Sequence, residues 1–231
     1  MNFAAARIAR ARAGRPAIDL WTASRSRLGE GAMRAFDLVG ATALLIVLAP
    51  LILVVMATIR LDSPGPAIYR QRRLGRDLKP FFVAKFRTMA QRAAADAHRE
   101  HVVRMIAGGA ASQPMTKLPK DARVTRVGAI LRRTSIDELP QLWNVLRGDM
   151  SLVGPRPPIQ YEVDRYPPEA FRRFSVRPGI TGLWQVRGRS LLSFRRMIEL
   201  DVEYVERRSL PLNLKILLLT LPAVIHGKGA A

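Results

Sequence analysis

The feature that most restricts the fold of this chain is an apolar run at residues 38–59, which contains no charged side chain. A helix rises about 1.5 Å per residue, so about 20 such residues match the hydrocarbon core of a bilayer. A cleavable signal peptide has a shorter apolar region, of roughly 7–15 residues, followed by a small-residue cleavage site. This run starts late and lacks such a site, so we expect a retained membrane helix at residues 35–61.

Pro50 lies near the middle of the run and predicts a kink, because proline removes a helical hydrogen bond and crowds the preceding turn. Arginines flank the run on both sides, among them Arg34 and Arg60. Basic flanks are retained on the cytoplasmic side of a membrane. A re-entrant helix, which enters and leaves the same leaflet, satisfies both observations. An ordinary kinked span is the alternative, since spanning helices tolerate proline.

The charge of the chain predicts an anionic partner. Lys and Arg number 38 against 18 Asp and Glu, which gives a formal net charge of +20. Nucleic acid, anionic lipid headgroups and phosphorylated small molecules all fit such an excess. Cysteine is absent and there are three histidines, which excludes disulfide scaffolds, thiolate metal clusters and cysteine nucleophiles. Any chemistry must therefore use carboxylates, hydroxyls or bases.

Around the apolar run we expect an arginine-rich N-terminal arm at residues 1–34 and a cytoplasmic domain at residues 62–231. The arm has a composition suited to anionic lipid or to a solvated tail. Residues 81–86 predict a short strand, and residues 210–225 an apolar segment that lies at the membrane interface or packs on the domain. Helical patterns occur at 88–107, 124–134, 137–147, 160–174 and 192–207. The expected fold class is α+β and α-rich, with a small catalytic domain on a proline-kinked membrane helix.

One short segment combines a helix start with a candidate nucleophile. Ser135 stands three residues before Glu138, the spacing of a capping box, and this structural role accounts for both residues. It leaves Asp137 unexplained. In the first turn of a helix, the exposed amides and the helix dipole favour an ionised carboxylate and also attract phosphate. Such a carboxylate can attack phosphorus once cations neutralise the phosphate charge.

Arginines that could bind phosphate follow in Gly- and Pro-rich segments, at Arg156 within residues 153–158 and at several positions within residues 177–189. The guanidinium group binds phosphate bidentately, although a solvated basic face is the alternative for any one of them. Asp201, with Glu203 two residues later, is a candidate Mg²⁺ ligand because hard oxygen donors suit this ion. A solvated helix turn explains this acidic pair equally well.

Four motifs occur in order behind the apolar run: Asp62 to Pro66 (DSPGP), Lys85 to Met89 (KFRTM), Arg132 to Pro157 (RRTSIDELPQLWNVLRGDMSLVGPRP) and Arg177 to Arg189 (RPGITGLWQVRGR). Together they resemble the bacterial sugar transferase family, the monotopic phosphoglycosyl transferases, over about residues 34–225. Two departures are Ala49, where many members have Ser, and Asn213, where many have Asp.

The resemblance implies transfer of a sugar 1-phosphate from a UDP-sugar to polyprenol (undecaprenyl) phosphate at the cytoplasmic face of the bacterial inner membrane. It implies Mg²⁺, a catalytic pair at Asp137 and Glu138, and a phosphosugar intermediate on Asp137, with Glu138 helping to hold the metal. UMP is released, and glycan assembly, such as that of exopolysaccharide or capsule, begins. The positions carried over as substrate-binding are Lys85, Arg87, Arg156, Arg177, Gln185 and Arg189.

Two rival functions come from other classes. A membrane-tethered protein that binds nucleic acid or lipid without catalysis is motivated by the charge of +20. Aromatic residues make up only 6% of the chain and no recognition helix is evident, so we expect no nucleic-acid partner. A membrane phosphatase that uses Asp137 would release free phosphate and would need no polyprenol phosphate.

Overall fold

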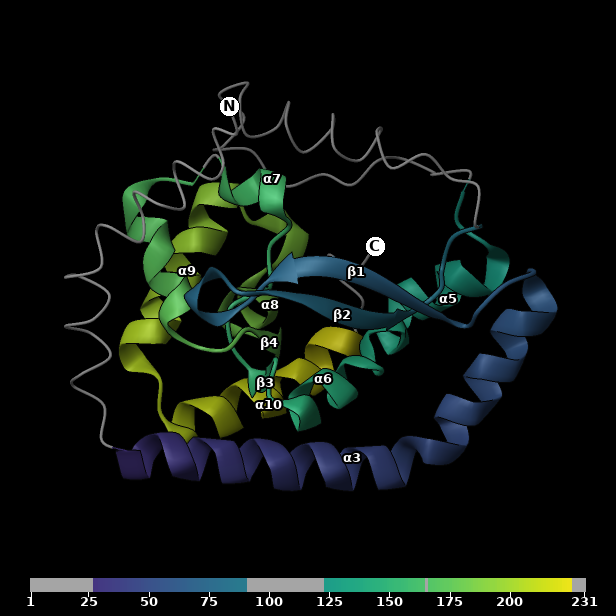
Figure 1. Ribbon diagram of the computed structural model, residues 1–231, viewed down its shortest axis with the longest axis horizontal. Coiled ribbons are helices and arrows are strands. Elements are labelled where there is room, and N and C mark those ends of the chain that lie inside the picture. The colour runs from purple at the N-terminus through teal and green to yellow at the C-terminus, as the bar shows by residue number, and fades with distance from the viewer. Residues whose placement is uncertain (1–26, 91–122, 165, 226–231) are drawn as a thin grey trace.

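The computed structural model describes residues 27–90, 123–164 and 166–225. One long helix, α3, runs along one side of the molecule, and the other helices and two small sheets stack on it (Figure 1). This is the helix-rich α+β arrangement predicted from the sequence. After α3 (Arg27–Asp62) the elements are β1 (Ile68–Leu74), β2 (Pro80–Phe86), α5 (Arg126–Thr134), α6 (Gln141–Arg147), β3 (Ser151–Val153), α7 (Gln160–Val163), β4 (Gly179–Thr181), α8 (Leu183–Arg187), α9 (Phe194–Arg207) and α10 (Leu210–Ile225).

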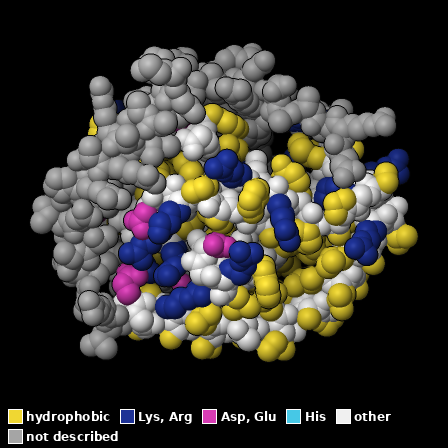
Figure 2. Space-filling view, in the orientation of Figure 1, with side chains coloured by type: hydrophobic (Ala, Val, Ile, Leu, Met, Phe, Trp, Pro, Cys, Tyr) yellow, Lys and Arg dark blue, Asp and Glu magenta, His cyan; other side chains and the backbone are white. Residues whose placement is uncertain are grey.

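Helix α3 has the length and composition of a membrane helix. It contains Pro50, and Figure 1 shows that its axis turns part-way along. Only 11% of its most apolar window is buried inside the protein, whereas the core helix of a soluble domain would be mostly covered. Hydrophobic side chains gather along this edge of the molecule, and Lys and Arg lie above it (Figure 2). These features indicate that the protein associates with a membrane.

The first half of α3 is held against the domain by polar contacts. The Arg34 guanidinium donates to two backbone carbonyls near the end of α6, at 2.7 and 2.9 Å. The Asp37 carboxylate accepts from a hydroxyl and a backbone amide at the start of β3, at 2.8 and 2.9 Å. The described part of α3 starts at Arg27 and so includes residues that the sequence assigned to the N-terminal arm. Residues 1–26 of that arm lie outside the described residues.

Strands β1 and β2 form an antiparallel hairpin that crosses the molecule on the face shown in Figure 1. Strand β2 confirms the strand expected at residues 81–86. Its partner β1 was missed because consecutive polar residues, from Arg70 to Arg73, hide the alternation that marks a strand. In this register Tyr69 pairs with Lys85, which lies one residue before the end of β2.

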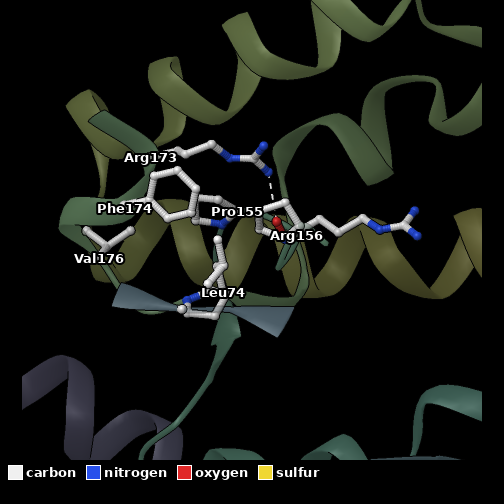
Figure 3. A pocket seen from close by; sticks show the side chains of 9 residues that line it. Leu74, Pro155, Arg156, Arg173, Phe174 and Val176 are labelled. Carbon is white, nitrogen blue, oxygen red and sulfur yellow. Dashed lines mark hydrogen bonds between the residues drawn. The ribbon is translucent and has the colours of Figure 1, made fainter. Parts of the chain in front are cut away.

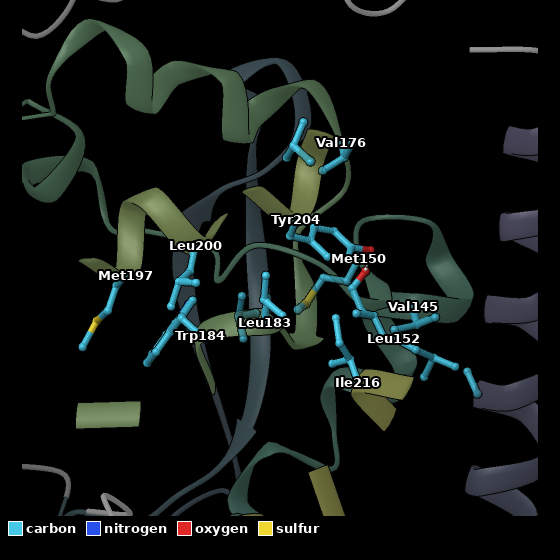
Figure 4. Packing of buried hydrophobic residues seen from close by; sticks show 14 of the residues in the cluster. Val145, Met150, Leu152, Val176, Leu183, Trp184, Met197, Leu200, Tyr204 and Ile216 are labelled. Atoms are coloured by element: carbon cyan, nitrogen blue, oxygen red, sulfur yellow. Dashed lines mark hydrogen bonds between the residues drawn. The ribbon is translucent and has the colours of Figure 1, made fainter. Parts of the chain in front are cut away.

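The main core lies around β3 and β4, which pair in parallel (Figure 4). Helix α9 contributes Leu200 and Tyr204, each 1% exposed, and α10 contributes Ile216, which is fully buried. The Tyr204 hydroxyl lies 2.8 Å from Asn213 Oδ1. Asn213 is 1% exposed, so this departure from the family pattern lies in the core. The exposed Leu218 on the same helix shows that only one face of α10 packs on the domain.

Prolines divide two of the expected helices. The pattern at 137–147 becomes a 3₁₀ turn followed by α6, with Pro140 before the helix. The pattern at 160–174 becomes the short α7 and a 3₁₀ segment at Pro168–Ser175. The helices expected at 124–134 and 192–207 are confirmed as α5 and α9. Most of the helix expected at 88–107 lies outside the described residues.

Candidate active site

Asp137 and Glu138 lie in a 3₁₀ turn, Ile136–Glu138, that joins α5 to α6. Ser135 ends α5 in the left-handed conformation, with φ of 57°, and its side chain makes no capping hydrogen bond. The predicted capping box is therefore wrong, because the chain turns at Ser135 instead of starting a helix there. The turn presents both acidic side chains, each partly exposed, at the surface of the domain.

Lys85 is the basic partner of this acidic turn. It comes from β2, against which the 3₁₀ turn packs. Its Nζ donates to Glu138 Oε1 at 2.8 Å, and the two side chains are 22% and 32% exposed. The pair joins two segments far apart in the sequence, and both partners stay within reach of a molecule that arrives from solvent.

The two neighbouring carboxyl groups differ in acidity. Burial raises the pKa of Asp137 to about 6; Lys85 opposes the rise and the Glu138 charge adds to it. Burial acts on Glu138 as well, but the charge and hydrogen bond of Lys85 and the charge of Arg156 outweigh it, and the pKa of Glu138 lies below its ordinary value. Glu138 is therefore ionised at neutral pH, and Asp137 gains its negative charge near pH 6.

Two more of the predicted cations lie near the acidic turn. The charge of Arg156 helps to lower the pKa of Glu138. Burial lowers the pKa of Arg189, and the Glu138 charge opposes this. Arg156 is exposed although the prolines on either side of it are buried. With Lys85, these arginines bring positive charge to Glu138, an arrangement that suits a phosphate group.

Three other residues predicted to bind substrate have structural partners. Arg87 is 6% exposed and donates to the backbone oxygen of Ser63, at 2.6 Å, in the turn that follows α3. Arg177 donates through Nε to the Gly148 carbonyl at 2.9 Å, and the Gln185 amide donates to a β4 carbonyl at 3.0 Å. Each holds backbone in place, so Lys85, Arg156 and Arg189 are the stronger candidates for contact with substrate.

The donor chemistry of the turn fits Mg²⁺, which takes one or two protein carboxylates and completes its shell with water and substrate phosphates. Asp137 and Glu138 supply two adjacent, partly exposed carboxylates. Asp201, the other predicted ligand, does not fit, because its buried carboxylate pairs with Arg173 at 2.6 Å and is 2% exposed. Within the described ranges, no group of three or more acidic or histidine side chains could hold a metal by itself.

Two buried arginines near the site were not predicted. Arg73 is 7% exposed and Arg173 is 6% exposed, and both donate to the backbone on either side of Pro157, next to Arg156. For Arg73, the sequence offered one indication of this role. It lies two residues after Gln71, and residues two apart in a strand point to the same face. Arg173 gave no signal, because it lies within the helical pattern at 160–174, where nothing in the sequence distinguishes it from its neighbours.

The model of the bacterial sugar transferase family matches residues 29–227. The exopolysaccharide production protein ExoY of Rhizobium meliloti is 40% identical over 204 residues, covering 88% of this chain and 89% of the relative. The UDP-glucose:undecaprenyl-phosphate glucose-1-phosphate transferase of Caulobacter vibrioides is 44% identical, covering 85% and 71%. The undecaprenyl-phosphate galactose phosphotransferase of Salmonella typhimurium is 39% identical, but the match covers only 41% of that protein.

Proposed function

Because the chain belongs to the bacterial sugar transferase family, we propose that it is a phosphoglycosyl transferase that moves a sugar 1-phosphate from a UDP-sugar to polyprenol (undecaprenyl) phosphate. UMP is the leaving product, and the lipid-linked sugar starts the assembly of an exopolysaccharide or related glycan. The name of the relative from Caulobacter vibrioides contains both substrates, and the name of the relative from Salmonella typhimurium contains undecaprenyl phosphate. The observation that carries the proposal is the acidic turn, in which Asp137 lies beside a Glu138 that is ion-paired with Lys85 and lies in the positive field of Arg156.

Asp137 is the proposed nucleophile. One of its carboxylate oxygens attacks the phosphorus that bears the sugar, the bond from that phosphorus to the bridging oxygen breaks, and UMP leaves with the electron pair. An oxygen of polyprenol phosphate then attacks the same phosphorus and frees the Asp137 carboxylate. The raised pKa suits this role, because a more basic carboxylate is a better nucleophile and is still ionised at neutral pH.

Glu138 and the cations prepare the site for two anionic substrates. Glu138, held by Lys85, would ligate Mg²⁺, and the ion would neutralise phosphate charge when bound. Arg156 and Arg189 lie near Glu138 and would bind the phosphate oxygens of the donor. Glu138 remains ionised across the neutral range, so this arrangement does not change with small shifts of pH.

The membrane arrangement follows the same proposal. Helix α3 would enter and leave the cytoplasmic leaflet, with its bend inside the lipid, and the exposed face of α10 would lie at the interface. The charged contacts of Arg34 and Asp37 fix the first half of α3 to the domain. The active site would thereby be held at the height where a polyprenol phosphate presents its headgroup.

The test is UMP release by the purified protein in nanodiscs with Mg²⁺, polyprenol phosphate and a panel of UDP-sugars. Replacement of the nucleophile, Asp137→Asn, should lower turnover by at least about 10³-fold while the protein stays folded and membrane-bound. Asp77→Asn removes an exposed carboxylate in the turn between β1 and β2 and is the matched control. UMP release by Asp137→Asn at the wild-type rate would reject the assignment of Asp137.

Two rival functions give different products. Family membership does not favour a non-catalytic membrane protein that binds nucleic acid or lipid, and such a protein would release no UMP from any donor. A membrane phosphatase would release free phosphate without polyprenol phosphate. The same assay therefore separates the three functions.

A further inference from the structure

Arg156 projects from a proline-rich segment, Pro155–Pro158, whose backbone is tied down at every carbonyl. The Pro155 carbonyl accepts from a backbone amide in β4 at 2.9 Å, and the Pro158 carbonyl accepts from the Leu74 amide at 3.0 Å. Between them, the Arg156 carbonyl accepts from the Arg173 guanidinium at 2.7 Å, and the Pro157 carbonyl accepts from the Arg73 guanidinium at 3.0 Å. The prolines have no amide hydrogen of their own, so these four bonds fix the segment.

Arg173 holds the carbonyl of Arg156 itself. Its guanidinium is 6% exposed, pairs with Asp201 at 2.6 Å and stacks over the Tyr166 ring, with 5.2 Å between the guanidinium carbon and the ring centroid. Figure 3 shows the Arg173 guanidinium directed at the backbone oxygen of Arg156, whose own side chain extends away from it. Arg173 therefore binds the backbone and leaves the Arg156 guanidinium free to face the site.

Arg73 holds the next carbonyl, that of Pro157. The guanidinium also donates twice to the Gln71 side-chain oxygen, at 3.0 and 2.7 Å. In the described part of the chain its hydrogen bonds all go to neutral oxygens. Burial and the Arg156 charge lower its pKa to about 10, against the opposing charges of Glu162 and Glu138, and Arg73 stays charged at neutral pH. A buried cation without a carboxylate contact is costly, and such a cost is accepted at functional sites.

We infer that Arg73 and Arg173 are positioning residues that fix the proline-rich segment and thereby aim the Arg156 guanidinium at the phosphate of the donor. The inference rests on the proposed function, because it gives Arg156 a phosphate to bind. It also gives Asp201 a role other than metal binding: its carboxylate neutralises Arg173, which allows that arginine to be buried. A guanidinium whose orientation is already fixed loses little conformational entropy when it binds phosphate. This favours both the affinity for the phosphate and its correct placement.

A double-mutant cycle tests the inference. Arg73→Met should lower kcat/KM for the UDP-sugar by about 10- to 100-fold, because a displaced phosphate-binding group misplaces the reacting phosphorus. Arg73→Lys, which keeps the charge and one donor, should recover part of this loss. In an Arg156→Ala background, Arg73→Met should cost less than about 3-fold, since the group that it positions is already gone. Arg72→Met, an exposed neighbour on the same strand, is the matched control and should change kcat/KM by less than about 2-fold.

Thermal unfolding and circular dichroism identify the folded variants, and Arg73→Lys carries the cycle if Arg73→Met does not fold. Equal losses in the wild-type and Arg156→Ala backgrounds would overturn the inference, because Arg73 would then act independently of Arg156. Full activity of a folded Arg73→Met protein would overturn it as well. Absence of UMP release by the wild-type protein would instead reject the proposed function, and the inference with it.

Discussion

The Lys85–Glu138 pair and the Arg173–Asp201 pair both join a basic side chain to a carboxylate, at 2.8 and 2.6 Å. In the first pair the side chains are 22% and 32% exposed, and in the second they are 6% and 2% exposed. The open pair stands beside Asp137, where a substrate can reach it, and the closed pair holds the backbone of Arg156 from behind. Burial, which sequence motifs do not report, separates the two pairs and is the basis for the different roles proposed for them.

The buried pair should have the largest effect on stability. Asp201→Asn leaves the Arg173 charge without its partner in a closed site, which costs about 3–5 kcal/mol for a buried pair. The melting temperature should fall by about 10 °C or more. Thermal unfolding of the protein in nanodiscs measures this, and a fall of less than 2 °C would show that the pair is not the structural support described here.

The Lys85–Glu138 pair should have a large effect on turnover and a small effect on stability. Glu138→Gln removes the charge that faces Lys85 and the proposed metal, so turnover should fall by about 100-fold. The melting temperature should change little, because pairs open to solvent contribute about 0–1 kcal/mol. UMP release and thermal unfolding on the same sample check both halves. A large loss of stability with unchanged turnover would reverse the contrast between the two pairs.

The pH dependence of UMP release should follow the ionisation of Asp137 and not that of Glu138. The nucleophile must be ionised, and its pKa is raised from 3.8 to about 6, so the rate should fall about tenfold per pH unit below pH 6. The pKa of Glu138 is lowered, so it contributes no change in this range. Polyprenol phosphate titrates near pH 6 as well, so the measurement is UMP release in the first turnover without acceptor. A flat profile between pH 5 and pH 8 would contradict the environment assigned to Asp137.

A fully solvated pair should have the smallest effect. Glu199 contacts Arg195 and Arg196 along α9, and its side chain is 45% exposed. Glu199→Gln should lower stability by less than about 0.5 kcal/mol and leave turnover unchanged. A larger effect on either readout would mean that exposure does not rank the ion pairs of this protein.

Features that depend on neighbouring residues were predictable from the sequence. The apolar run gave α3, and the Asp137–Glu138 segment was identified as the candidate catalytic turn although its local geometry was wrong. The expected helix at 160–174 failed because Pro167 and Pro168 interrupt its periodicity. The apolar run, the acidic segment and the two interrupting prolines are all visible in the order of residues along a short segment.

Features that depend on tertiary contacts were not predictable. Strand β1 is recognisable only through its pairing with β2. Asp201 looked like a metal ligand because nothing in its segment indicates that Arg173, on another element, closes over it. The same limit applies to Arg87 and Arg177, because their sequence motifs do not indicate that they hold backbone after α3 and α6.

The most direct test of the account is intact-protein mass spectrometry after incubation with the active UDP-sugar and Mg²⁺ but without polyprenol phosphate. The account predicts one sugar phosphate bound per chain, located on the peptide that contains Asp137, absent from Asp137→Asn and discharged when polyprenol phosphate is added. UMP release only in the presence of acceptor, with no adduct, would indicate direct transfer between the substrates. An adduct on another residue would show that Asp137 is not the nucleophile.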